Sequence, residues 1–303
     1  MRDYLFHLVA TVCCMTLTAS ASPALADDED VYPDDIAASE DAIVLGPISA
    51  WNINYGDESC RLSRLFGSEE DQHLLFFEQS APSDGFGVTM AGSSLRRFRH
   101  AQSIELGMER GQPMGQQRIY KANFGAFGPA IVVSSHSLEH STEALTASQN
   151  AGIDLVAAET VNRVVIKRSR RVLSFETGNM RAPMEALNSC TFSFLEEWGL
   201  NPELHRNYTP PRWTNELPVA QRLQEIYPRR AIRRGEQGVF RLRAIVEADG
   251  SMSACHIVNS TAQNELETSA CAEMENAEFD PAIDSNGRPM RSFYATSISY
   301  RLN

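Results

Sequence analysis

The stretch that decides the fold runs from Gly238 to Ala282 and reads GVFRLRAIVEADGSMSACHIVNSTAQNELETSACAEMENAEFDPA. Its opening residues alternate between apolar and polar side chains, as in a strand with one face on a core. The dipeptide Asp249-Gly250 is a strong signal for a two-residue hairpin turn, and a second alternating run begins at Met252. This stretch therefore predicts an antiparallel hairpin.

The alternation also assigns a side to each residue of the first strand. The apolar side consists of Phe240, Leu242, Ala244 and Val246. The charged side consists of Arg241, Arg243 and Glu247. An antiparallel sheet commonly packs one face on the core and leaves the other in water. We therefore expect the arginine face to be solvated.

Further elements flank the hairpin. A short amphipathic helix is predicted over 219–226, and a second helix with a capping pattern at its start is predicted over 264–277. A long closing strand is expected after the turn at Asn286-Gly287. The predicted order is helix, strand, strand, helix, strand, with an antiparallel sheet.

An ordered set of short motifs accompanies these elements. It consists of Tyr227-Pro228, Ala231, Gly235, Gly238-Val239, Asp249-Gly250, Asn259-Ser260-Thr261, Leu266-Glu267, Phe279-Asp280-Pro281-Ala282 and Gly287-Arg288-Pro289-Met290. In this order the motifs resemble the TonB C-terminal domain family over about residues 218–303. Ala262 and Glu267 depart from the family pattern, which more often has Gly and Asp at these positions.

The resemblance implies a peptide-binding strand. Domains of this family bind outer-membrane receptors by capturing an extended peptide beside the last strand. A strand edge with unpaired backbone groups is suited to such pairing. The candidate binding residues are therefore Met290, Arg291, Ser292, Phe293, Tyr294, Ala295, Thr296, Ser297, Ile298, Ser299 and Tyr300.

The function expected from this resemblance is non-enzymatic. We expect a periplasmic protein of the Gram-negative envelope, linked to TonB-dependent transmembrane transport, with an outer-membrane receptor or another envelope protein as partner and no cofactor. The alternative is a periplasmic cell-wall or protein-binding adaptor that reuses the fold. Exposed edges also permit a homodimer formed by strand pairing.

The beginning of the chain predicts export. A weakly basic end precedes an apolar run, and Ala24-Leu25-Ala26 then precedes an acidic segment. This pattern is typical of a signal peptide cleaved between Ala26 and Asp27. The apolar run is shorter than the roughly 20 residues that a membrane helix needs. An uncleaved inner-membrane anchor is the alternative.

Composition divides the rest of the chain. After a signal peptide over 1–26, residues 27–41 are expected to be an acidic, disordered lead-in. Short alternating runs and one helix predict a β-rich domain of unknown role over 42–200, and prolines indicate a linker over 201–216. The TonB-like domain occupies 217–303. The chain as a whole is therefore expected to be α+β.

Four cysteines lie beyond Ala26, at positions 60, 190, 255 and 271. An even number in an exported chain indicates two disulfides, and the sequence alone permits three pairings. Because Cys255 and Cys271 belong to the same small unit, we expect them to pair with each other. Cys60 and Cys190 would then form the second bond.

Other partner classes and chemistries find less support. The formal net charge of −12 disfavours nucleic acid. The segment His136-Ser137-Leu138-Glu139-His140 fits the H-x-x-E-H pattern of a zinc peptidase, which is a less favoured alternative. A strand-like run leads directly into it, so a polar segment with solvated histidines is the simpler interpretation. We expect no metal and no catalytic residue.

Overall fold

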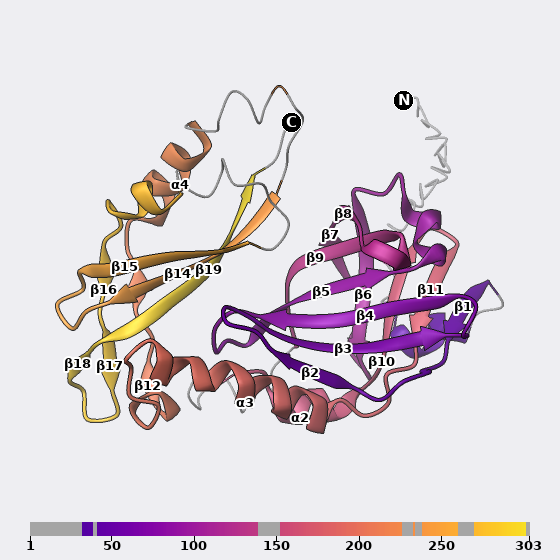
Figure 1. Ribbon diagram of the computed structural model, residues 1–303, viewed down its shortest axis with the longest axis horizontal. Coiled ribbons are helices and arrows are strands. Elements are labelled where there is room, and N and C mark those ends of the chain that lie inside the picture. Colours follow the sequence, from indigo (N-terminus) through magenta and orange to yellow (C-terminus); the bar gives the residue numbers. More distant parts are fainter. Residues whose placement is uncertain are drawn as a thin grey trace, which may run out of the picture. The chain divides into compact units, whose positions relative to one another are not determined.

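The computed structural model describes residues 32–38, 41–138, 152–225, 233, 238–259 and 270–300 (Figure 1). The expected signal peptide, with its cleavage site at Ala26 and Asp27, lies outside the described residues. Runs of mostly antiparallel strands are interrupted by a few helices along the chain, which confirms the α+β class. No described helix has the length and apolar content needed to cross a membrane.

A six-stranded antiparallel sheet forms the first layer, in the order β2-β3-β4-β5-β9-β8. Its strands are β2 (Asn52–Tyr55), β3 (Cys60–Gly67), β4 (Gln72–Gln79), β5 (Gly85–Ala91), β8 (Tyr120–Asn123) and β9 (Pro129–Ser137). The successive strands β2 to β5 are neighbours in the sheet, as expected for hairpins joined by short turns.

A five-stranded sheet forms the second layer, in the order β1-β11-β10-β6-β7. Its strands are β1 (Ala42–Leu45), β6 (Ser103–Glu109), β7 (Gly115–Arg118), β10 (Val161–Arg168) and β11 (Arg171–Phe175). The β1–β11 pair is parallel and the other pairs are antiparallel. Short helical segments connect the strands: η1 (Ser93–Phe98), η2 (Gly125–Phe127) and α2 (Leu155–Thr160).

Helix α3 (Arg181–Glu197) closes the core of this β-rich region. Its buried side chains recur at three-to-four spacing and join one apolar cluster with both sheets. The Cys60–Cys190 disulfide fastens β3 to α3, with a Cα–Cα distance of 6.0 Å. The predicted pairing is therefore confirmed.

The lead-in is partly ordered. Residues Pro33–Ala37 form helix α1, which packs against β10 and β11. Pro33 and Ala37 are buried. The carboxylate of Asp34 forms an ion pair with Arg163 at 3.2 Å. The expectation of disorder over 27–41 is wrong for this segment, because its apolar residues find a surface on the second sheet.

The C-terminal sheet has three strands in the order β15-β14-β19. They are β14 (Gly238–Val246), β15 (Met252–Asn259) and β19 (Ser292–Tyr300), all antiparallel. Apolar side chains of one face pack with helix α4 (Glu216–Glu225) and with the residues from Ala270 to Met274. The Cys255–Cys271 disulfide holds β15 to that second helical segment, as predicted.

The hairpin loop is longer than the sequence indicated. The amide of Glu247 donates to the carbonyl of Ser251 at 2.8 Å, so three residues form the loop. Gly250 adopts a φ of +85°, which glycine reaches without strain. A three-residue loop with a left-handed glycine is the next most common hairpin connection.

Residues 201–216 are not a free linker. Two short strands in this segment pair with the C-terminal part: β12 (Tyr208–Thr209) with β17 (Ala282–Asp284), and β13 (Arg212–Trp213) with β16 (Phe279–Asp280). Trp213 lies against the rings of Phe279 and Tyr294, with centroid distances of 6.1 and 5.8 Å. An apolar tryptophan thus attaches the proline-containing segment to the C-terminal sheet.

The arginine face of β14 is not solvated. Arg241 and Arg243 are each only 7% exposed. The end of α3 and the segment after it cover this face through a cluster of Leu195, Leu200, Ile245, Phe293 and Ala81. The guanidinium of Arg243 lies 4.0 Å from the ring centroid of Trp198, in a cation–π contact. The alternation assigned the faces correctly, but the expected exposure is wrong because a second apolar surface covers the charged face.

Candidate functional site

Strand β19 lies at one edge of the C-terminal sheet. Among the described strands it pairs with β14 only, from Ser292 opposite Val246 to Tyr300 opposite Gly238. Its far side therefore presents backbone groups that no described strand pairs. The strand contains nine of the eleven candidate binding residues, from Ser292 to Tyr300.

The remaining two candidates belong to other parts of the fold. Met290 lies in β18 (Pro289–Met290), which pairs with β17, and its side chain is buried against Tyr208 and Ala282. Arg291 forms an ion pair with Glu247 at 3.0 Å. The expected continuous last strand is thus interrupted at Arg291, and Met290 is not on the same edge.

The first two residues of β19 are anchored. His205 lies between the carbonyl of Asn201, 2.7 Å from Nδ1, and the hydroxyl of Ser292, 3.0 Å from Nε2. The carbonyl can only accept, so Nδ1 carries the proton and Nε2 accepts from Ser292. Phe293 packs on Trp198 and His205, with ring centroids 5.4 and 6.0 Å away. Burial lowers the pKa of His205, which favours this neutral ring.

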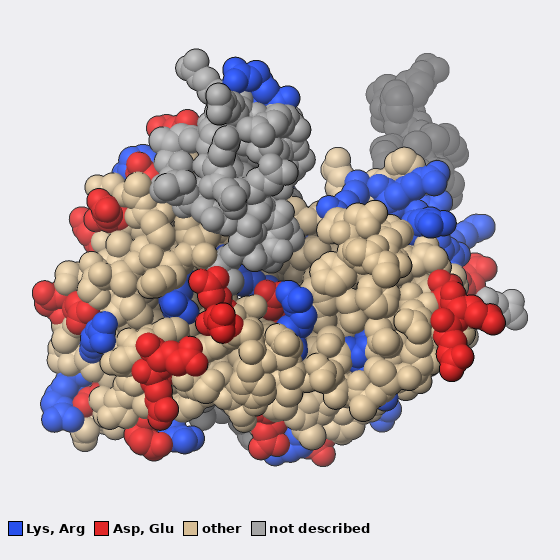
Figure 2. All heavy atoms as spheres, in the orientation of Figure 1, with Lys and Arg blue, Asp and Glu red and all other residues tan. Residues whose placement is uncertain are grey.

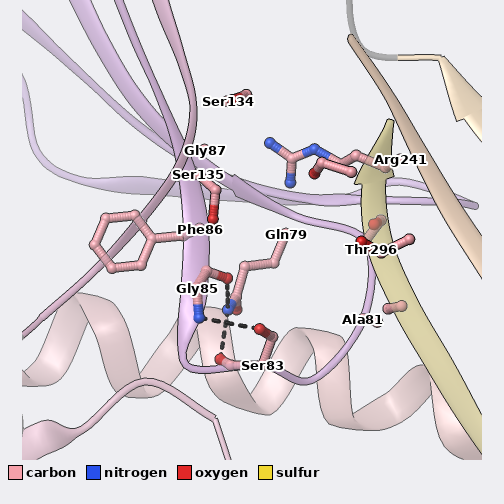
Figure 3. Close-up of a pocket in the computed structure, with 13 residues that line it drawn as sticks. Gln79, Ala81, Ser83, Gly85, Phe86, Gly87, Ser134, Ser135, Arg241 and Thr296 are labelled. Carbon is pink, nitrogen blue, oxygen red and sulfur yellow. Dashed lines mark hydrogen bonds between the residues drawn. The ribbon is translucent and has the colours of Figure 1, made fainter. Parts of the chain in front are cut away.

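A cavity opens beside the middle of β19. Its volume is about 330 Å³. Residues Ala295, Thr296 and Ser297 line it from β19, and Arg241 lines it from β14. The opposite wall comes from the β4–β5 hairpin, between Gln79 and Gly87, and from Ser134 and Ser135 of β9 (Figure 3). Segments far apart in the sequence therefore share one cavity.

Hydrogen bonds fix the rim of the β4–β5 hairpin. The side-chain amide nitrogen Nε2 of Gln79 donates to the carbonyls of Ser83 and Gly85 at 2.7 and 2.9 Å. The backbone amide of Gly85 donates to the hydroxyl of Ser83 at 3.0 Å (Figure 3). The hairpin is thus held in one conformation by its own side chains.

Arg241 is the buried charge of this site. Its Nη1 donates to the carbonyl of Glu78 at 2.7 Å. The carboxylate of Glu78 in turn pairs with Arg61 at 3.2 Å. Burial lowers the pKa of Arg241, and the negative charge of Glu78 partly opposes that effect.

Gly87 provides the space that Arg241 occupies. A Cβ atom at Gly87 would lie 2.0 Å from Nη2 and 3.2 Å from Cζ of Arg241. The guanidinium reaches from the C-terminal sheet toward Gly87 and Ser134 (Figure 3). The segment Gly85-Phe86-Gly87 belongs to β5, so here a glycine makes room for a side chain from another sheet.

The described start of the pattern that suggested a zinc peptidase lies in a strand. His136 lies in β9, and Glu139 and His140 fall outside the described residues. Burial lowers the pKa of His136 to about 4, and its ring meets Phe86 edge to face at 5.7 Å. The described residues contain no group of three or more potential metal ligands. The interpretation of His136 as a solvated histidine is wrong, because the strand places it against a phenylalanine.

Charges of both signs share the visible surface. Figure 2 shows acidic and basic side chains on the same face, with a group of basic side chains together at the upper right and wide areas that carry neither sign. The net charge of −12 keeps the absence of a nucleic-acid partner as an expectation.

Residues 224–302 match the family model described as the Gram-negative bacterial TonB protein C-terminal. This part of the chain is similar to TonB C-terminal domains. The match begins near the end of α4 and includes β14, β15 and β19. A search of curated proteins finds no match for the chain. The domain implies a TonB-related role in the cell envelope, and domains of this family generally interact with outer-membrane receptors.

Sequence reasoning missed the opposite wall of the cavity. The β4–β5 hairpin lies about 160 positions before Arg241 in the chain, and no short motif links the two segments. One signal was present, since a glycine inside an apolar strand often marks a close approach by another group. Gly87 fits that description, but its partner could not be named from the sequence.

Proposed function

We propose that this protein is a non-enzymatic component of the periplasm that binds extended segments of outer-membrane receptors, or of other envelope proteins, by strand addition along β19. The observation that carries the proposal is the position of β19 at the edge of the TonB C-terminal sheet, beside a cavity lined by Ala295, Thr296 and Ser297. Main-chain pairing would supply affinity, and the cavity would accept side chains of the added segment.

The rest of the sheet supports this choice of surface. Its two faces are packed on α4 and on the end of α3, respectively. Packing of this kind restricts partner binding to the edges. Of the two edge strands, β19 has the cavity beside it.

Proline substitution tests the edge directly. Successive peptide groups of a strand point to opposite sides, so Thr296→Pro and Ser297→Pro remove donors on different sides. The variant that loses an inward donor to β14 should be destabilised. The other variant should keep its stability but lose binding of a peptide from the N-terminal periplasmic segment of an outer-membrane receptor.

The opposite edge offers a matched control. Ser253 is an exposed residue of β15, and Ser253→Pro should leave peptide binding intact. Amide hydrogen exchange by NMR provides a second measurement, because an added strand should protect alternate amides of β19. If the peptide binds but protects β15, or if both β19 variants bind as well as the unaltered chain, strand addition at β19 is wrong.

A further inference from the structure

The cavity beside β19 has an unusual lining. Of the described residues that border it, Arg241 is the one with a charged side chain. Hydroxyl groups make up most of the remaining polar lining, from Ser80, Ser83, Ser134, Ser135, Thr296 and Ser297. A guanidinium surrounded by hydroxyl donors is suited to an anion.

Arg241 retains donor capacity that the described residues do not use. A guanidinium has five N–H groups. One bond runs from Nη1 to the carbonyl of Glu78, while the buried Nε has no hydrogen-bond partner among the described residues. The carboxylate of Glu78 is engaged by Arg61, at 3.2 Å. A buried donor without a partner costs free energy, so a ligand that supplies an acceptor gains that energy on binding.

We propose that the cavity binds a carboxylate carried by the segment that adds to β19, with Arg241 as its anchor. This inference rests on the proposed function and specifies the kind of segment that the site prefers. Arg–carboxylate pairs can form two parallel hydrogen bonds, and such bonds strengthen away from water. One water molecule takes about 30 Å³, so a cavity of about 330 Å³ has room for part of a peptide.

The position of Arg241 couples the carboxylate to the strand. Arg241 lies on β14 opposite Ser297 of β19. A segment that adds to the free edge of β19 would therefore be separated from Arg241 by β19 alone. Thr296 and Ser297 of β19 would lie between the segment and the guanidinium. An acidic side chain of the segment, or its terminal carboxylate, would reach the cavity from that direction.

Substitutions at two glycines of the opposite wall test the carboxylate site without removing the charge of Arg241. In Gly87→Ala the added Cβ would lie 2.0 Å from Nη2 of Arg241, so the guanidinium must move. In Gly85→Ala the nearest atom is the hydroxyl of Ser135 at 3.2 Å, and Arg241 is not among the nearest atoms. Gly85→Ala thus adds the same bulk to this wall and touches a hydroxyl of the lining, but it leaves the guanidinium in place.

The experiment measures binding of three hexapeptides to the full chain by calorimetry. All three peptides alternate Thr and Val. The first has an internal Glu and blocked ends, and the second has Gln in place of that Glu, also with blocked ends. The third has the same Gln and a free C-terminal carboxylate. We expect a carboxylate to improve binding by about tenfold. The preference should disappear in Arg241→Gln and in Gly87→Ala and persist in Gly85→Ala. Comparison of the first and third peptides identifies the source of the carboxylate.

A second readout separates the two proposals. The Nε–H NMR signal of Arg241 should shift saturably with sodium acetate and not with acetamide. If all three peptides bind equally well to the unaltered chain, the carboxylate site is wrong and strand addition stands. If no peptide binds but acetate shifts the signal, strand addition is wrong and the anion site stands. If neither is seen, both are wrong.

Discussion

Replacing Phe293 with alanine tests whether the covered face of the C-terminal sheet stabilises the whole molecule. The side chain is 5% exposed and belongs to a cluster with Leu195, Leu200 and Ile245. Its ring lies 5.4 Å from that of Trp198, at the end of α3. The substitution removes one aromatic ring from the contact between the β-rich region and the C-terminal sheet.

The expected cost follows from burial. Truncation of a buried phenylalanine to alanine costs about 3–5 kcal/mol, which includes the lost aromatic pairing and the cavity left behind. Since Phe293 is almost fully buried and its neighbours come from helix α3 and a β-strand, the site cannot collapse easily. We expect a loss of about 4 kcal/mol in the free energy of unfolding.

Urea unfolding followed by far-ultraviolet circular dichroism measures this loss without relying on the fluorescence of Trp198. Phe76→Ala is a matched control, because Phe76 is 3% exposed and lies in β4, against Phe124 at 5.4 Å. Both variants should lose similar stability, and amide exchange in β14 should be faster in Phe293→Ala than in Phe76→Ala. A loss below about 1 kcal/mol for Phe293→Ala would refute the idea that this face is packed.

The remaining predictions concern local features. Replacing Cys255 and Cys271 with serine should cost about 3 kcal/mol, since the bond closes a loop of 16 residues, as measured by urea unfolding against the oxidised protein. The folded pKa of His136, about 4, lies below the ordinary 6.5, so the unfolded chain takes up the proton first as the pH falls. The free energy of unfolding should therefore fall by about 3 kcal/mol between pH 6.5 and 4. A pH series of unfolding curves should show a smaller fall for His136→Gln. Gly250→Ala should cost at least about 1 kcal/mol, because φ is +85° and its Cβ would lie 2.3 Å from the carbonyl oxygen of Phe279; an unchanged melting temperature would contradict this.

Local patterns predicted the C-terminal sheet well. Alternation between Phe240 and Val246 identified the strand β14 and the faces of its residues. The two disulfides could be assigned because Cys255 and Cys271 lie close in sequence, within one unit. These features depend on neighbouring residues, and their periods and spacings are visible in the sequence.

Exposure was harder to predict, because it depends on surfaces far away in the chain. The hydrogen bond from Arg241 to Glu78 spans 163 positions. Nothing in the strand around Arg241 indicates that the end of α3 and the β4–β5 hairpin cover it. The same limit applies to His136, which is largely buried and contacts Phe86 on a neighbouring strand. A strand pattern specifies which residues share a face, and only the packing of whole elements decides what that face meets.

The presence of a buried arginine at position 241 is itself an argument about function. A buried charge carries a large desolvation cost, and well-packed apolar residues often replace buried ionic groups without loss of stability. Ile245, on the same face of β14, shows that an apolar side chain is accommodated against this surface. The single described hydrogen bond of Arg241, to the carbonyl of Glu78, leaves most of its donors unused by the rest of the described chain. Stability alone therefore gives a weak reason for an arginine here, whereas a carboxylate ligand gives a specific one.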